Sequence, residues 1–324
     1  MKFIELKSTN PHYNLAVEEY LFNNATESVF MLWQNDNTVV IGKNQNAYVE
    51  VNIDVLKNKN ITLARRATGG GAVYHDLGNV NYSFINPCSQ TEGIDFEYFT
   101  RPMISALKSL GVNARLSGRN DIETFDGLKI SGSAQRRVGS RVLHHGTMLF
   151  SSDLSVLSTV LTPDREKLSS KAVKSVKKRV CNVSELCAVK SVLEFKSIIK
   201  NFIINELSAT QEEFLPNKEV EELYKKYSSF EFIYGEKPFL TNYDKIYKKR
   251  FDFGVVELKL SIEKGVVKKA KFQGDFFELK ELTSLEKAFE NLPFTSLESI
   301  VQKIDFKTFI SGMKSEDFIS LINY

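Results

Sequence analysis

Short runs of apolar and β-branched residues recur along the first half of the chain and predict buried strands. They cover residues 3–6, 29–34, 38–42, 80–86 and 141–150. Runs of about four to eight such residues between turn signals are typical of strands, whereas helices need about ten or more. Two asparagines and an aspartate separate the second run from the third. This composition favours a tight hairpin between those two strands.

Helical periodicity appears between several of these strands. In residues 96–111 the apolar side chains of Phe99, Met103 and Leu107 recur at helical spacing, and Gly111 is a natural helix end. Asn52 is a favourable N-terminal cap for another helix. The helices expected from such patterns cover residues 11–24, 52–60, 96–111, 191–207 and 217–229.

The order of the elements predicts the fold class. Further strand-like runs cover residues 61–66, 121–125 and 128–135, and Asp126-Gly127 is a hairpin turn signal between the last two. Strict alternation of strand and helix is missing, so a Rossmann fold is not supported. We expect an α+β fold with a mixed or antiparallel sheet and flanking helices.

The chain divides near residue 245. Residues 235–245 are polar and irregular, which is typical of a boundary. Residues 255–272 then alternate on both sides of Glu-Lys-Gly, which predicts a hairpin. We therefore expect a large N-terminal domain at residues 1–245 and a small C-terminal α/β domain at residues 246–324.

Composition excludes several classes of protein. The 324 residues carry 43 Lys and Arg against 40 Asp and Glu, a net charge of +3, so a general nucleic-acid binder is not indicated. No run of about 18 apolar residues predicts a membrane span. The three cysteines, Cys88, Cys181 and Cys187, fit neither a disulfide framework nor a zinc site. A reducing, cytoplasmic location is expected.

A glycine-rich loop is the first candidate for chemistry. Arg65 and Arg66 precede three consecutive glycines at 69–71. Glycines admit positive φ and let backbone N–H groups approach an anion, and arginine suits phosphate or carboxylate. Neither a P-loop nor a dinucleotide fingerprint is present. The alternative is a plain turn between two strands with arginines at the surface.

Two further motifs carry weaker signals. Lys129 lies in a predicted strand and is followed by small residues, so its ammonium could meet an anion; the alternative is an ordinary surface lysine. Adjacent strand residues point to opposite faces, so only one of His144 and His145 can face a shared site. Either histidine could instead be structural. The basic stretch from Lys167 to Arg179 suits a loop that closes over phosphates, or a solvated face.

Eight motifs in this order resemble the lipoate–protein ligase A family, and the resemblance covers almost the whole chain. They are SxxPxxNLAxEE at 8–19, TVVIGKNQN at 38–46, RRATGGGAVYHDLGN at 65–79, SGRND at 117–121, KISGSA at 129–134, HHGTMLF at 144–150, LTPDREKLSSKAVKSVKKRVCN at 161–182 and FGVVELKLSIEKG at 253–265.

The resemblance implies a fold, a reaction and partners. The fold would be a biotin/lipoyl ligase domain with a core like that of class II synthetases, plus a small C-terminal domain. The reaction would use ATP, with Mg²⁺ on the triphosphate, to convert lipoate to lipoyl-AMP and pyrophosphate. The lipoyl group would then pass to a lysine of an acceptor domain, in glycine-cleavage H protein or the E2 subunits of oxo-acid dehydrogenases. A monomer with no nucleic-acid or membrane partner is expected.

The resemblance also implies roles for individual residues. Lys129 would be the catalytic residue, touching both the lipoyl carbonyl and the α-phosphate. Cys181 stands where we expect a threonine-like residue and has no implied role. Lys171, Val173, Val176 and Val180 would belong to a loop that covers the adenylate. The lipoate and ATP contacts would be Arg65, Gly70, Gly71, Ala72, Val73, His75, Asn79, Asp121, Lys129, Ser133, Ala134, His145 and Gly146.

Three alternatives stay open. An octanoyl or lipoyl transferase of the same fold would use a cysteine thioester, but the segment before the Lys129 strand has no cysteine. A biotin ligase would carry a GRGRxxR-like segment, which we do not find. A non-catalytic protein that binds carrier domains would not need the glycine loop or Lys129.

Overall fold

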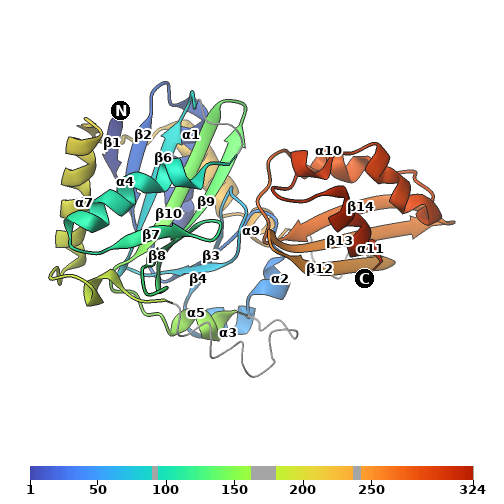
Figure 1. Ribbon diagram of the computed structural model, residues 1–324, viewed down its shortest axis with the longest axis horizontal. Coiled ribbons are helices and arrows are strands. Elements are labelled where there is room, and N and C mark those ends of the chain that lie inside the picture. Colours follow the sequence, from blue (N-terminus) through green and yellow to red (C-terminus); the bar gives the residue numbers. More distant parts are fainter. Residues whose placement is uncertain (90–93, 162–179, 236–241, 324) are drawn as a thin grey trace.

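The computed structural model describes residues 1–324 except 90–93, 162–179, 236–241 and 324. The chain forms a large N-terminal lobe and a small C-terminal lobe (Figure 1). The large lobe is built on an eight-stranded sheet. In spatial order its strands are β11 (Thr210–Glu212), β1 (Lys2–Glu5), β2 (Val29–Trp33), β6 (Asn79–Asn86), β10 (Arg141–Leu149), β9 (Lys129–Val138), β8 (Asp121–Thr124) and β7 (Ala114–Ser117).

The sheet is mixed, as the sequence predicts. β1 pairs in parallel with β2 and β11, and the other neighbours are antiparallel. Helices cover both faces (Figure 1). On one face lie α4 (Phe96–Ser109) and α7 (Val192–Glu206), and on the other α1 (Pro11–Asn24) and α8 (Lys218–Tyr227). The α+β architecture is therefore confirmed.

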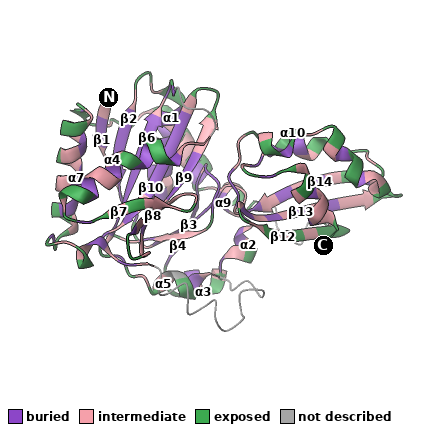
Figure 2. Ribbon diagram, in the orientation of Figure 1, coloured by how far each residue is buried: buried purple, intermediate pink, exposed green. Residues whose placement is uncertain are grey.

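Alternation along the strands divides the core between these two faces. In β2, Phe30 and Leu32 pack with α4 and α7, whereas Met31 and Trp33 pack with α1 and α8. All four are nearly inaccessible to solvent. Burying each such side chain contributes about 1.5–3 kcal/mol. The central strands are accordingly buried on both sides, while the outer helical faces are exposed (Figure 2). The functional residues of these strands are thus held on a rigid support.

The predicted hairpin between residues 29–34 and 38–42 is wrong. β3 (Thr38–Ile41) leaves the large sheet and lies at the centre of a second, three-stranded sheet, between β4 (Thr62–Arg65) and β5 (Val73–His75). Residues 34–37, which connect β2 to β3, are held by hydrogen bonds to Thr9 and Asn14. The N–H of Asp36 donates to the carbonyl of Thr9 at 3.0 Å, and Asn14 Nδ2 donates to the carbonyl of Gln34 at 2.8 Å. The asparagine-rich turn is therefore a crossing between sheets.

Short helices complete the large lobe. Asn52 caps α3 as predicted, accepting from the N–H of Val55. The short helices are α2 (Ala47–Glu50), α3 (Ile53–Asn58), α5 (Val156–Val160), η2 (Val183–Glu185) and α9 (Phe230–Tyr234).

The small lobe has an antiparallel sheet and its own core. β12 (Lys245–Phe251), β13 (Gly254–Glu263) and β14 (Val266–Gly274) pair in sequence order. The turn at Lys264-Gly265 has positive φ at both residues, as a tight hairpin requires. The predicted hairpin is confirmed. The elements packed on this sheet are α10 (Leu282–Lys287), η3 (Phe294–Gln302), η4 (Phe306–Thr308) and α11 (Ser315–Ile322).

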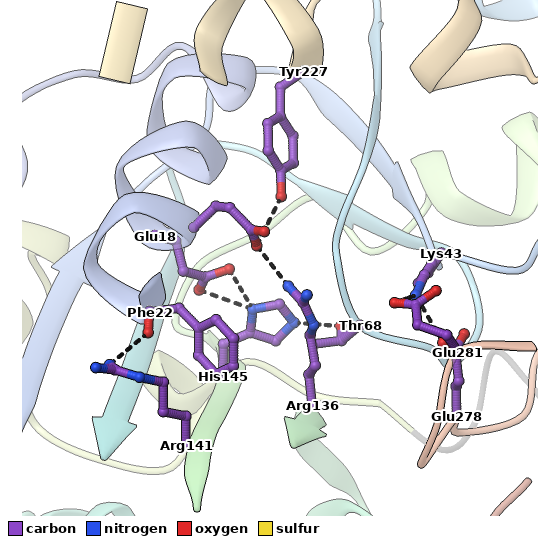
Figure 3. A network of polar contacts seen from close by, with 11 residues as sticks. Glu18, Phe22, Lys43, Thr68, Arg136, Arg141, His145, Tyr227, Glu278 and Glu281 are labelled. Atoms are coloured by element: carbon purple, nitrogen blue, oxygen red, sulfur yellow. Dashed lines mark hydrogen bonds and ion pairs between the residues drawn. The ribbon is translucent and has the colours of Figure 1, made fainter. Parts of the chain in front are cut away.

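The lobes meet at the glycine loop. The N–H of Gly70 donates to the carbonyl of Phe276 at 3.3 Å. Lys43 Nζ forms ion pairs with Glu278 at 2.7 Å and Glu281 at 2.9 Å, on the right of Figure 3. Within the described residues, no helix has the length and apolar character to cross a membrane.

Candidate active site

A cavity of about 250 Å³ lies in the large lobe. Its walls come from strands of both sheets and from the glycine loop. The fold therefore brings together motifs far apart in sequence; Thr68 and His145, 77 positions apart, are hydrogen-bonded at 2.8 Å. The predicted site residues that line the cavity are Gly70, Gly71, Ala72, Val73, His75, Asp121, Lys129, Ser133, Ala134, His145 and Gly146.

The cavity is lined by buried apolar side chains on one part of its wall and by partly exposed charged side chains on another. Leu15, Trp33 and Val40 line it and are almost completely buried in the apolar cluster beneath α1. The side chains of Asp121 and Lys129 keep 28% and 34% of their exposure, which places them at the mouth. A cavity of this kind fits a ligand with an apolar body and an anionic end.

Lys129 is held at the mouth by a carboxylate. Its Nζ lies 2.8 Å from Asp121 Oδ1, and the two residues come from the neighbouring strands β9 and β8. Gly132 leaves room for the ammonium, since a Cβ there would lie 3.0 Å from Nζ. The Lys129 carbonyl accepts from the N–H of Cys181 at 3.0 Å. Lys129 is thus a positioned cation that an anionic ligand can reach.

The glycine loop is shaped by Arg66. Its Nη2 donates to the carbonyls of Gly69 at 2.7 Å and Gly71 at 2.9 Å, and the side chain lines the cavity. Gly70 has φ of +92°, a conformation that favours glycine. Burial lowers the pKa of Arg66 to about 10, opposed by the nearby charge of Glu18, so the guanidinium stays protonated near neutral pH. The loop therefore has a fixed positive charge beneath it.

Arg65 does not lie where the sequence placed it. Its guanidinium points away from the cavity and donates to backbone carbonyls of Gly42, Lys43, Gln45, Phe232 and Ile233 at 2.7–3.0 Å. Successive strand residues face opposite sides, so only one of the two arginines can face the cavity, and that one is Arg66. In this structure Arg65 ties β4 to α9.

A network of buried hydrogen bonds supports the cavity wall (Figure 3). His145 Nδ1 lies 2.9 Å from Glu18 Oε1, and its Nε2 lies 2.8 Å from Thr68 Oγ1. Thr68 in turn accepts from Arg66 Nε at 3.0 Å, and Ser83 Oγ donates to Glu18 at 2.6 Å. Sequence reasoning missed Glu18 and Thr68 as site residues, although both stand inside quoted motifs.

The remaining predicted residues lie beside the cavity or outside it. Asn79 is fully buried but does not line the cavity; its amide donates to Asn81, which does. Val180 forms an isolated bridge with Lys129, outside the cavity lining. Lys171, Val173 and Val176, with the rest of the basic stretch, fall outside the described residues.

Histidines 144 and 145 face opposite sides of β10. His145 lines the cavity, whereas His144 stacks on Phe99 at 5.5 Å in the core beneath α4. Burial lowers the pKa of His144 to about 3. The sequence-based interpretation that one histidine faces the site agrees with this arrangement.

Cys181 packs in the same core. Its residue exposure is 6%, and burial raises the pKa of its thiol. A nucleophilic cysteine needs the opposite, an accessible thiol with a lowered pKa. The environment of Cys181 is that of a structural residue.

Arg119, between β7 and β8 of the large lobe, connects the cavity lining to the small lobe. This residue lines the mouth, its guanidinium lies 4.2 Å from the ring centroid of Phe277, and it donates to the carbonyl of Phe253. Burial lowers the pKa of Arg119. The sequence analysis singled out Asp121 in SGRND and missed Arg119 and Asn120, which also line the cavity.

Comparison with known families defines the class of the protein. The family model described as lipoyl protein ligase A/B catalytic domain matches residues 10–204, and the one described as bacterial lipoate protein ligase C-terminus matches residues 241–322. Together with a cavity for an apolar acid, these matches place the chain among the lipoyl ligases.

Two similar proteins identify the family more narrowly as that of the lipoate–protein ligases. Lipoate–protein ligase 1 of Staphylococcus aureus is 40% identical over 89% of each chain. A lipoate-protein ligase of Bacillus subtilis is 34% identical over 99% of this chain and 100% of its own. The chain belongs to the lipoate–protein ligase family, and it is an enzyme that ligates lipoate.

Solved structures agree with the fold. LipL1 of P. falciparum, in complex with lipoate, has a TM-score of 0.82 at 25% identity and covers 99% of this chain and 97% of its own. A lipoate-protein ligase A bound with ATP has a TM-score of 0.60 at 30% identity over 72% of this chain and 98% of its own. A bi-partite ligase of Thermoplasma acidophilum, described with its E2 lipoyl domain, has a TM-score of 0.63 at 32% identity over 72% and 96%.

Proposed function

We propose that this ligase works in two steps through an adenylate. In the first, a carboxylate oxygen of lipoate attacks the α-phosphorus of ATP; a new P–O bond forms and the bond to pyrophosphate breaks. In the second, the neutral amine nitrogen Nζ of an acceptor lysine attacks the acyl carbon; a C–N bond forms, AMP leaves with the electrons of the broken C–O bond, and the nitrogen gives its extra proton to solvent. The observation that carries this proposal is Lys129, a positioned cation at the mouth of a cavity whose lining also includes the apolar side chains of Leu15, Trp33 and Val40.

Charge explains why Lys129 is needed. The first step joins two anions, so positive groups must lie where negative charge gathers in the transition state. Lys129 supplies one such group, and Arg66 and Arg119 add charge to the same lining. We assign the phosphate role to these residues in place of Arg65, whose donors are taken by backbone carbonyls. Ala72 and Val73 would lie along the acyl chain.

Mg²⁺ would arrive with the triphosphate. The described residues contain no cluster of three or more acidic, histidine or cysteine side chains that could hold a metal. Asp121 offers one carboxylate at the mouth, already paired with Lys129. Mg²⁺ commonly takes one or two carboxylates, phosphate oxygens and water, so these residues fit a metal that enters as part of the nucleotide substrate.

The acceptor and the domain division complete the proposal. The acceptor would be the lipoyl domain of an oxo-acid dehydrogenase E2 subunit or glycine-cleavage H protein; a solved relative is described with such an E2 domain. We divide the chain at residue 245 into a catalytic and an accessory domain, since the small lobe has its own core. We also propose a cytoplasmic monomer, and the free cysteines accord with a reducing compartment.

An ATP–pyrophosphate exchange assay tests the first step. Exchange should depend on free lipoate and should be absent with biotin. Lys129→Ala should lower exchange by two orders of magnitude or more, about the loss seen on removing one transition-state donor, while leaving the circular dichroism spectrum unchanged. Lys268→Ala, which removes a lysine from β14 of the small lobe, should exchange like the parent. Full activity of Lys129→Ala would refute the assignment of this residue.

A further inference from the structure

One residue of the cavity lining has a buried ring nitrogen that no hydrogen-bonding group among the described residues contacts. His75 lines the cavity and is only 4% exposed. Its Nε2 is buried and finds no partner among the described residues. The ring lies edge-on to Trp33, with centroids 6.4 Å apart, in the apolar part of the lining. Buried polar atoms are rarely left unpaired, and one at a binding site points to a ligand.

A chain of asparagine contacts decides which ring nitrogen carries the proton. Asn14 Nδ2 donates to the carbonyls of Ser8 at 3.1 Å and Gln34 at 2.8 Å, which fixes the orientation of that amide. The same nitrogen donates to Asn35 Oδ1 at 3.0 Å, so the amide nitrogen of Asn35 is the atom that faces His75 Nδ1, at 3.1 Å. Nδ1 must therefore accept. In a neutral imidazole the proton then lies on Nε2.

The ring is neutral at physiological pH. Burial, with a smaller contribution from the charges of Arg66 and His145, lowers the pKa of His75 to about 3. Nε2 is consequently a fixed donor that cannot become an acceptor without breaking the contact to Asn35. A ligand atom beside it must be able to accept.

We propose that Nε2–H of His75 donates to a sulfur atom of the dithiolane ring and thereby selects lipoate over a straight-chain acid of the same length. The inference rests on the proposed function. Because the reacting carboxylate must reach Lys129 at the mouth, the other end of the ligand lies deep, beside Trp33 and His75. Sulfur is a weak acceptor, whereas a methylene group accepts nothing. Octanoate would leave the buried donor unsatisfied, which disfavours its binding.

The test compares lipoate with octanoate in the exchange assay. His75→Phe keeps an aromatic ring but removes the donor. We expect the ratio of kcat/KM for lipoate to that for octanoate to fall about fivefold or more, the low end of the loss for an unpaired buried donor. His75→Gln, whose amide can donate, should recover part of the ratio. Val40→Ala is the matched control: it shortens an apolar wall, should weaken both acids alike and should leave the ratio unchanged.

A spectroscopic measurement keeps the inference testable if His75→Phe does not fold. In the parent protein with ¹⁵N-labelled histidine, His75 should show the Nε2–H tautomer, and its Nε2 proton should shift with lipoate and much less with octanoate. An Nδ1–H tautomer would overturn the inference. If the parent activates neither acid, the proposed function and this inference fall together. If it activates both and His75→Phe leaves the ratio unchanged, only the inference falls.

Discussion

At the scale of single residues, side chains adjacent in the sequence occupy different environments and make different contacts. Arg65 and Arg66 are adjacent and both buried, yet one ties α9 to β4 and the other supports the glycine loop. His144 and His145 are likewise separated by the strand, one in the apolar core and one in the cavity wall. The function of each residue thus follows from the face it occupies.

The two buried neutral histidines should make stability depend on pH. Burial lowers the pKa of both His75 and His144 to about 3, below the unfolded value near 6.5. Below pH 6.5 the unfolded chain therefore binds protons that the fold does not, and the free energy of unfolding falls by about 1.4 kcal/mol per pH unit for each histidine. This loss should continue until the pH nears 3.

His144→Phe isolates one of these contributions. The substituted ring would fill the space beside Phe99 without a titrating group. Between pH 6.5 and 5, urea denaturation should show that the variant loses about 1.6 kcal/mol less stability than the parent. Parallel stability curves for the two proteins would contradict the assignment of a buried neutral His144.

At the scale of elements, close backbone contacts constrain the first part of the glycine loop. A Cβ on Gly69 would lie 2.2 Å from the carbonyl oxygen of Phe276, and one on Gly42 would lie 2.1 Å from that of Gly70. Gly71, by contrast, has no atom within 4 Å of its hypothetical Cβ. Of the three consecutive glycines, Gly69 and Gly70 are therefore constrained by their surroundings, whereas Gly71 is not.

Alanine substitution should separate these requirements. Gly70→Ala combines a φ of +92° with a Cβ 2.9 Å from Arg66 Nη2, and should cost about 1–3 kcal/mol of stability. Gly71→Ala should change stability by less than about 0.5 kcal/mol. The measurement is the midpoint of urea denaturation for both variants under the same conditions. Equal midpoints would show that the loop is not constrained at Gly70.

The sequence predicted correctly those features that depend on residues close together in the chain, and failed where residues far apart in the chain determine the structure. The antiparallel strands, the Lys264-Gly265 hairpin and the Asn52 cap are set by local periodicity and turn chemistry, and these predictions are confirmed. The hairpin at 34–38 failed because α1, distant in sequence, holds that connection. Glu18 was missed because its partner His145 is 127 residues away. No local pattern could say which of two arginines faces a cavity.

At the scale of the whole molecule, the small lobe packs against a residue of the cavity wall. Phe277 is fully buried between Phe96, at 5.2 Å, and Arg119, at 4.2 Å. The lobe therefore braces a residue of the cavity mouth as well as contacting the glycine loop. The two lobes are therefore in contact at the cavity mouth even though each has its own apolar core.

Phe277→Ala should uncouple the lobes. Loss of a buried phenylalanine costs about 3–5 kcal/mol, and here that loss falls on the contact between lobes. Calorimetry should show one unfolding transition for the parent and two for the variant. Phe318→Ala, a matched change within the core of the small lobe, should lower the stability of that lobe without exposing Arg119. A single transition in Phe277→Ala would indicate that other contacts couple the lobes.

The dependence of the mouth on Phe276 and Phe277 has a consequence for synthesis on the ribosome. Every strand of the large sheet except β11 has been made once residue 149 is joined, but the residues that brace Arg119 and Gly70 follow much later. At about 5–20 residues per second, these bracing residues are added on the order of ten seconds after those seven strands have been synthesised. The contacts that brace the cavity mouth thus form late, when translation has reached the last quarter of the chain.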